Sequence, residues 1–215
     1  MVEKKRKLAV IMVGAPGSGK GTQGEFLEKS TGFKRYVMSD LIKKELKPGN
    51  ELYDKVFTQG ILLGDTEIFD IFRKYFKSEN EIIIDGIPRT LDQAYWLYGF
   101  LMRHDYEIEL VYLKVNEKSL VKRITSRFYC PKCHSVYNKI VEGKIPKKEG
   151  ICDLDGQKLV QREDDTVKVF KERIKIFDEV RDVILEVYKG DIIQVDGDRD
   201  IEKVSQELIK NIILR

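Results

Sequence analysis

The sequence predicts an α/β fold in which helices cover both faces of a central parallel β-sheet. Short apolar runs recur along the chain, and each is followed by a glycine-rich or polar turn and then by a helical pattern. Strands buried on both faces are apolar throughout, and helices make the crossovers between parallel strands. The apolar runs that we expect to form strands are 8–13, 82–84, 110–115 and 192–195.

The composition indicates a folded chain without a general affinity for polyanions. Of the 215 residues, 42% are hydrophobic and 35% are charged, which is too apolar for a disordered chain. The net charge of +3 is small, so neither nucleic acid nor a membrane surface is an expected partner. No segment approaches the roughly 18 apolar residues that a membrane span requires. We therefore expect a cytoplasmic protein, with a monomer as the default.

Capping residues mark two of the predicted helices, and two segments interrupt the alternation. Asn116 is expected to cap the helix that follows it, and Asp198 or Asp200 the last helix of the chain. Residues 37–66 predict short helices, whereas residues 128–160 are rich in turns and predict a small β insert. Both segments are therefore interpreted as insertions into the sheet-forming core.

A glycine-rich loop follows the first predicted strand. Gly14-x4-Gly19-Lys20 lies between a strand and a helix, which is the context of a phosphate-binding loop. Backbone amides can surround an anion there, the helix N-terminus adds partial positive charge, and Lys20 can reach the terminal phosphates. An ordinary strand-to-helix turn is the alternative. The loop departs from the general motif because Gly21 occupies the Ser/Thr position and Thr22 follows it.

Asp85 is the expected second half of the phosphate site. It ends the strand in "EIIIDG", and open α/β sheets place ligand groups at the carboxyl ends of their strands. Because Gly21 has no hydroxyl group for magnesium, Asp85 is expected to hold Mg²⁺ through water. The alternative is a plain Asp-Gly turn.

All three cysteines lie in the second insert and predict a structural zinc site. An odd number of cysteines argues against a disulfide framework, and paired Cys-x2 turns direct ligands to one tetrahedral centre. His134 or Asp153 is an alternative fourth ligand, and thiols without metal are a further alternative. The expected ligands are Cys130, Cys133, Cys152 and Asp155.

The segments "GAPGSGKGTQ" and "DGIPRTLDQ" together resemble the adenylate kinases, within the nucleoside monophosphate kinases. The resemblance covers about residues 8–199 and includes both inserts. It implies the reversible reaction of MgATP with AMP to give two ADP, hence a role in adenine nucleotide homeostasis. It also implies a P-loop core of residues 1–36, 67–127 and 166–215, a monophosphate-binding insert of residues 37–66 and a lid of residues 128–165.

Arginines at family positions are expected to stabilise the charge that develops during phosphoryl transfer. Arg123 and Arg127 are four residues apart and are expected on one helical face. Arg162 and Arg173 can converge if the helix between them is continuous. Asp164 and Asp165 match family positions and are expected either to orient arginines or to cap a helix. The expected catalytic residues are Lys20, Asp85, Arg89, Arg123, Arg127, Arg162 and Arg173.

The resemblance also implies two nucleotide sites. Gln93 matches the glutamine that presents an amide to adenine, but Met38 and Lys43 replace the usual Thr and Arg. We therefore expect AMP as the preferred acceptor, with relaxed selection against other monophosphates. The implied ATP contacts are Gly17, Ser18, Gly19, Lys20, Gly21, Thr22, Arg123, Arg127, Val136, Tyr137 and Arg199. The implied AMP contacts are Met38, Lys43, Ile61, Leu62, Leu63, Gly86, Arg89, Gln93, Arg162 and Arg173.

Three rival functions remain open from the sequence. One is a purely structural nucleotide-binding switch, which would leave the converging arginines without a purpose. A broad nucleoside monophosphate kinase would have the same loop and a less selective acceptor site. A zinc-ribbon module for nucleic acid would use the cysteines with neighbouring basic residues, although the small net charge argues against it. Those basic residues are Lys132, Lys144, Lys147 and Lys148.

Overall fold

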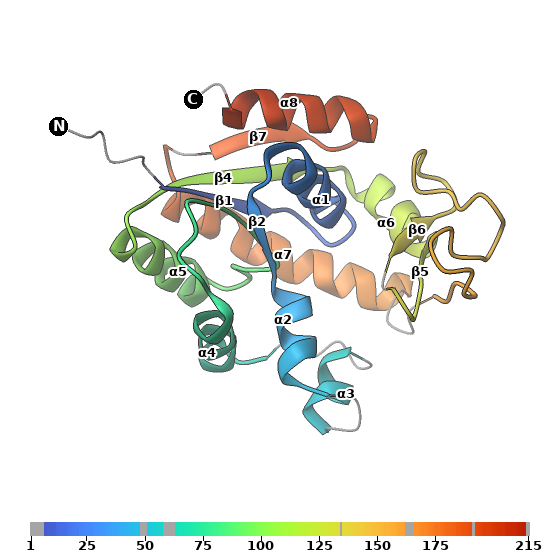
Figure 1. Cartoon of the computed structure of the whole chain (residues 1–215), viewed down its shortest axis with the longest axis horizontal. Helices are drawn as coiled ribbons and strands as arrows, with labels where there is room; N and C mark the ends of the chain where they lie inside the picture. The colour runs from blue at the N-terminus through green and yellow to red at the C-terminus, as the bar shows by residue number, and fades with distance from the viewer. Residues whose placement is uncertain are drawn as a thin grey trace.

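The computed structural model describes residues 7–47, 51–57, 63–133, 135–161, 166–190 and 192–213. A parallel five-stranded sheet with the strand order β2-β3-β1-β4-β7 forms its centre (Figure 1). This confirms the predicted fold class. The strands are β1 (Lys7–Val13), β2 (Lys34–Val37), β3 (Glu81–Asp85), β4 (Tyr106–Lys114) and β7 (Ile192–Asp196).

Helices bury both faces of the sheet. Side chains of β1 alternate between two apolar clusters, with Ile11 in one and Val10 in the other. Helices α1 (Lys20–Thr31) and α8 (Ile201–Ile213) pack on the Val10 side. The Ile11 side is covered by α4 (Asp65–Tyr75), α5 (Leu91–Arg103) and α7 (Val167–Val187). Within the described residues, no helix combines the length and apolar character that crossing a membrane requires.

The carboxyl ends of the strands meet at one edge of the sheet. Met12 of β1 is in register with Asp85 of β3, so the glycine loop and Asp85 leave the sheet side by side. Helix α6 (Glu117–Thr125) starts at the same edge, and Asn116 caps it by accepting a hydrogen bond from the Ser119 N–H (2.9 Å). Asp198 does not cap α8, because its carboxylate instead accepts hydrogen bonds from Asn116 N and Nδ2.

The two inserts extend from this edge. The first contains α2 (Met38–Glu45) and α3 (Glu51–Phe57), which project away from the sheet (Figure 1). The second contains the antiparallel strands β5 (Arg127–Tyr129) and β6 (Val136–Asn138), with isolated bridges that join Tyr129 to Val160 and Ile151 to Lys158. Short helices in one insert and a small β structure in the other agree with the sequence prediction.

Candidate active site and metal centre

The glycine loop connects β1 to α1 and places Lys20 at the first position of that helix. The Lys20 ammonium donates hydrogen bonds to the carbonyl oxygens of Gly14 (2.5 Å) and Ala15 (3.0 Å), so the loop curls around its own lysine. Burial lowers the pKa of Lys20 from 10.5 to about 8, although Asp85 opposes the shift. The loop thus has the geometry of an anion site, with a lysine that can exchange carbonyl contacts for phosphate oxygens.

Close packing explains why glycine begins the loop. A Cβ atom on Gly14 would lie 2.6 Å from Ser18 Oγ and 2.8 Å from the carbonyl oxygen of Leu113. Ser18 Oγ is buried, and among the described residues it has no hydrogen-bond partner. A buried hydroxyl without a partner costs free energy, and a bound phosphate oxygen would supply one. The interior of the loop therefore fits an anionic ligand.

Asp85 is buried at the end of β3 and faces the start of α1. Its Oδ2 atom lies 3.7 Å from the position that a Cβ atom on Gly21 would occupy. Burial raises the pKa of this carboxyl, while nearby Lys20, Arg35 and Arg89 lower it. A buried carboxylate beside a phosphate loop fits a water-bridged Mg²⁺ ion, which is the role that the sequence predicts. That role stays a prediction.

Arg123 and Arg127 reach the same cleft from different elements. Arg123 lies on α6, and its guanidinium donates to the carbonyl oxygens of Gly197 (2.8 Å) and Ser18 (3.4 Å). Arg127 does not lie on that helix, because α6 ends at Thr125 and Arg127 begins β5. The expectation that the two share one helical face is therefore wrong. Both nevertheless line the cleft, Arg123 from α6 and Arg127 from the first residue of β5.

Arg173 lies on α7 and lines the cleft. The expected continuous helix back to Arg162 does not exist, because α7 begins at Val167. Its N-cap is Thr166, which accepts a hydrogen bond from the Val169 N–H (3.3 Å), so neither Asp164 nor Asp165 caps this helix. The predicted residues outside the described part of the chain are Ile61, Leu62, His134, Arg162, Asp164 and Asp165.

Gln93 lies at the start of α5, buried and held by hydrogen bonds on both ends of its amide. Its Oε1 atom accepts from the backbone N–H of Arg89 (2.8 Å), and its Nε2 atom donates to Asp65 Oδ1 (2.8 Å). The hydroxyl of Thr90 donates to both oxygens of Asp65 (3.1 Å each) and caps α5 by accepting from the Gln93 N–H. The Gln93 side chain is therefore fixed in position at the wall of the cleft.

Met38 and Lys43 lie opposite this wall on α2. Met38 is buried against Gly86, where an added Cβ atom would come within 3.0 Å of Met38 Cβ. Gly86 has φ +99°, a conformation that a residue with a side chain adopts only under strain. Lys43 is half-buried, and its Nζ atom lies 4.0 Å from Asp40 Oδ1. An apolar surface and a single cation therefore stand where the family pattern has a hydroxyl and a guanidinium.

One cleft of about 1990 Å³ joins these parts. It runs from the glycine loop, past the arginines, to the pocket between α2 and α5. Asp85 and Tyr137 are predicted site residues that do not line it. The predicted residues that do are Gly17, Ser18, Gly19, Lys20, Gly21, Thr22, Met38, Lys43, Leu63, Gly86, Arg89, Gln93, Arg123, Arg127, Val136, Arg173 and Arg199.

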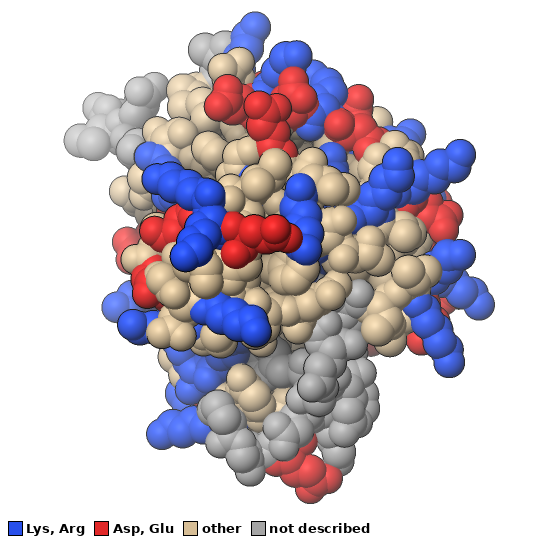
Figure 2. Space-filling view, turned by 90° about the vertical axis from the view of Figure 1, so that its right-hand side faces the viewer, with Lys and Arg blue, Asp and Glu red and all other residues tan. Residues whose placement is uncertain are grey.

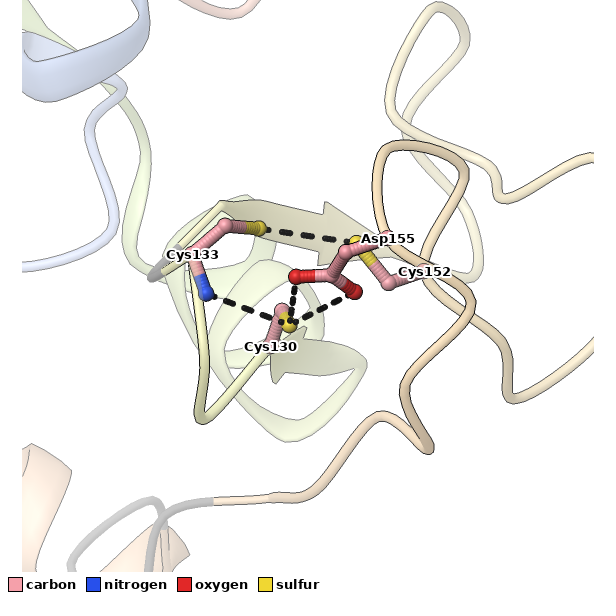
Figure 3. A group of neighbouring side chains, drawn as sticks. All are labelled: Cys130, Cys133, Cys152 and Asp155. Atoms are coloured by element: carbon pink, nitrogen blue, oxygen red, sulfur yellow. Dashed lines mark hydrogen bonds between the residues drawn. The ribbon is translucent and has the colours of Figure 1, made fainter.

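The lid brings the four predicted metal ligands together (Figure 3). The ligand atoms all lie within 4.8 Å of one another. Cys133 Sγ lies 3.5 Å from Cys152 Sγ, and Cys130 Sγ lies 3.3 Å from an Asp155 oxygen. Tetrahedral ligands at Zn–S distances of about 2.3 Å are separated by about 3.8 Å, so the cluster fits zinc. Asp153 is excluded from the group because its Oδ1 atom accepts from the Lys147 N–H (2.9 Å) and caps a turn.

A hydrogen bond within its own turn lowers the pKa of the Asp155 carboxyl, which suits a cation ligand. The Gln157 N–H donates to Asp155 Oδ1 (3.0 Å), and this hydrogen bond holds the pKa of the carboxyl at about 2. The carboxylate is therefore ionised over the whole physiological pH range, as a metal ligand must be. Two short β turns, one with a pair of cysteines and one with a cysteine and an aspartate, thus converge on one point.

Comparison with known proteins decides the family. The adenylate kinase family model matches residues 12–193, which include the glycine loop, most of the cleft lining and the metal cluster. The chain belongs to the adenylate kinase family. It is 33% identical over 207 residues to "Adenylate kinase" of Petrotoga mobilis, covering 94% of this chain and 95% of that protein. It is 34% identical over 208 residues to "Adenylate kinase" of Oceanobacillus iheyensis, with 93% and 96% covered.

Two site residues of this adenylate kinase family member, Arg35 and Asp65, were not predicted from its sequence, and a third, Tyr137, was predicted in a different role. Arg35 lies on the short strand β2, lines the cleft and donates to the Gly21 carbonyl (3.3 Å). Asp65 binds Gln93 from a different helix, and no spacing in the sequence relates the two residues. Tyr137 was expected to contact ATP, but its hydroxyl lies 3.4 Å from Cys152 Sγ. Of the three, only the position of Tyr137 could have been found from the sequence. Side chains alternate between the two faces of a strand, so one face of a strand beside a cysteine turn lies toward the predicted metal ligands.

Proposed function

We propose that this protein transfers the terminal phosphoryl group of MgATP reversibly to AMP, giving two ADP. The observation that supports this proposal most directly is one continuous cleft, which joins the Lys20 loop to the pocket around Gln93. In the forward direction, an oxygen of the AMP phosphate forms a bond to the γ-phosphorus as the bond to the β,γ-bridging oxygen breaks. The β-phosphate of the donor keeps that electron pair, so both products are diphosphates.

The protein supplies position and charge, not a nucleophile. The loop amides and Lys20 hold the donor phosphates, with Lys20 leaving the carbonyls of Gly14 and Ala15. Arg123 is already fixed by two carbonyl oxygens, so its guanidinium is ordered before substrate arrives. Such preorganised donors act on the charge that develops in the transition state. We assign the acceptor phosphate to Lys43, Arg89 and the remaining arginines.

Two metal ions belong to this proposal in different roles. Mg²⁺ accompanies ATP and would neutralise part of the charge of its phosphates. Asp85 would hold this ion through water. Zn²⁺ would be structural, because three thiolates and one carboxylate close a tetrahedral site. The zinc site lies in the lid, and Cys133 is the ligand that borders the cleft. We also propose that residues 37–66 and 128–165 act as separate substrate-binding units on the core.

Steady-state phosphoryl transfer from ATP to AMP, CMP, UMP and GMP tests the proposal. The wild-type protein is expected to use AMP best, with measurable transfer to at least one other monophosphate. A Lys20→Met variant should lose activity by about 10²-fold or more, since one preorganised donor contributes that much. Retention of wild-type activity in this variant would overturn the assignment, and equal rejection of the three other monophosphates would remove the relaxed selectivity.

Surface charge helps to separate the kinase from a nucleic-acid module. The lid-bearing side shows Asp and Glu side chains among the Lys and Arg side chains (Figure 2). A nucleic-acid site is expected to be a basic stripe, because its affinity comes from phosphate contacts. Lys144, one of the basic residues of that alternative, lies 3.6 Å from Glu25 of α1. The mixed surface charge and this ion pair favour the kinase over a nucleic-acid-binding module.

A further inference from the structure

The amide of Gln93 is held in one of its two possible orientations. A glutamine amide has an oxygen that only accepts hydrogen bonds and a nitrogen that only donates them. Its Oε1 atom meets the Arg89 N–H and its Nε2 atom meets Asp65 Oδ1, both at 2.8 Å. A backbone N–H can only donate, and a carboxylate can only accept. Rotating the amide by half a turn would therefore break both hydrogen bonds. It would place two donors face to face at the Arg89 end and two acceptors face to face at the Asp65 end.

Asp65 is itself fixed. It is the first residue of α4, and the Thr90 hydroxyl donates to both of its oxygens at 3.1 Å. Thr90 in turn caps α5, the helix that carries Gln93. The carboxylate thus joins the N-termini of two helices, and it cannot move away from Gln93 without losing the Thr90 contact. Only one orientation of the amide satisfies all of these groups.

The fixed amide leaves a defined pattern for a ligand. After the two contacts above, one lone pair of Oε1 and one N–H of Nε2 have no partner among the described residues. A base with an exocyclic amino group beside a ring nitrogen acceptor matches that pattern, as in adenine and cytosine. A base with an oxo group beside a ring N–H presents the reverse pattern, as in hypoxanthine, guanine and uracil.

We propose that Asp65 is a positioning residue that sets acceptor specificity: by fixing the Gln93 amide, it admits amino bases and rejects oxo bases. This inference rests on the proposed function. It also predicts that the relaxed selectivity expected from Met38 and Lys43 extends to CMP but not to UMP or GMP. Each hydrogen bond lost on reversal changes an equilibrium by up to about tenfold. Two lost bonds would therefore discriminate by up to about 100-fold.

The test replaces Asp65 by Asn, whose side chain has nearly the same shape but can present either an oxygen or an NH₂ group to Gln93. We would measure kcat/KM for AMP against inosine monophosphate, its 6-oxo counterpart, and for CMP against UMP. The matched control is Asp70→Asn on the same helix, where the carboxylate is exposed and pairs with Arg73. Thermal melting and the KM for ATP would show whether each variant keeps its fold.

Both ratios, AMP to inosine monophosphate and CMP to UMP, should fall by up to about tenfold in Asp65→Asn, because the Arg89 N–H still holds the other end of the amide, and should stay unchanged in Asp70→Asn. A merely structural role for Asp65 would lower all four values together and leave the ratios constant. Constant ratios in an active Asp65→Asn enzyme, or a wild-type enzyme that uses the oxo bases equally well, would overturn the inference alone. Absence of transfer from wild-type protein to every monophosphate would overturn the proposed function with it.

Discussion

The charge of Lys20 in the free protein depends on its surroundings. Burial lowers its pKa to about 8, so the ammonium form that binds phosphate predominates only below that pH. We expect the Kd for ATP to be nearly constant from pH 7 to 8 and to rise by up to about tenfold per pH unit above it. Calorimetric titration with ATP over this range measures the effect.

The Lys20→Met variant is the control for this pH dependence. Its affinity for ATP should be weak and flat over the same range, and a slope equal to that of the wild type would assign the titration to another group. The same lowered pKa makes the unfolded chain bind more protons between about pH 8 and 10.5. The contribution of Lys20 to the free energy of unfolding therefore increases as the pH rises through that window.

In the proposed acceptor site, Lys43 would offer the acceptor phosphate one point charge where a guanidinium could donate two parallel hydrogen bonds. We expect Lys43→Arg to lower the KM for AMP by about threefold to tenfold, with kcat nearly unchanged. The matched control is Lys44→Arg, because Lys44 is the next residue of α2 and is exposed. Steady-state kinetics at saturating ATP would measure both, and an unchanged KM in Lys43→Arg would show that this residue does not contact the acceptor phosphate.

At the scale of elements, β6 links the lid backbone to the metal cluster through Tyr137. The Asp153 N–H donates to the Tyr137 hydroxyl (2.8 Å), which leaves the hydroxyl hydrogen for Cys152 Sγ. Groups that orient metal ligands typically change metal affinity by about tenfold to 100-fold when removed. We therefore expect Tyr137→Phe to release zinc about tenfold faster to a chromogenic chelator.

The control for this effect is Tyr129→Phe. Tyr129 lies on the neighbouring strand β5 and lines the cleft. Zinc release from that variant should match the wild type. If both variants lose zinc at the same rate, loosening of the hairpin rather than the contact with Cys152 is responsible.

The sequence predicts the elements whose signals are local. Strand β1 is apolar on both faces and Asn116 is a cap, so each is recognisable from a few neighbouring residues. Strand β2 was missed because its residues 34–37 begin with exposed Lys34 and form an edge strand, which has only one neighbour. Arg127 was placed on a helix because nothing in "RITSRF" marks where α6 stops. The structure ends it at Thr125, and Arg127 then pairs with Asn138.

The residues of the candidate site likewise divide into those with a local signal in the sequence and those without one. The phosphate loop and the metal ligands are predictable because each is a short spacing with one geometry. The contact between Asp65 and Gln93 is not, because it depends on how the N-termini of α4 and α5 meet in space. Contacts between elements are set by packing, and a single sequence carries no local signal for them.

At the scale of the whole molecule, the core and the lid are stabilised by different means. Two large apolar clusters, one on each face of the sheet, hold the core. The buried cluster of the lid is small, and two of its members are the predicted metal ligands Cys130 and Cys152. Hydrogen bonds join the two parts among the described residues, such as that from Asn138 Nδ2 to the Arg123 carbonyl oxygen (2.7 Å). We therefore expect the lid, unlike the core, to depend on a bound metal ion for its stability.

Removal of zinc should consequently unfold the lid and leave the core folded. Structural zinc supplies folding free energy to small domains that lack an apolar core of their own, so the zinc-free lid has little to hold it together. We expect chelator treatment to expose residues 128–161 to limited proteolysis, while far-ultraviolet circular dichroism retains most of the helical signal. Phosphoryl transfer should fall with the loss of order, because Arg127 would no longer be held at the cleft. Added Zn²⁺ should restore both properties and Mg²⁺ should not, whereas a zinc-free protein with an unchanged proteolysis pattern would show that the lid folds without metal.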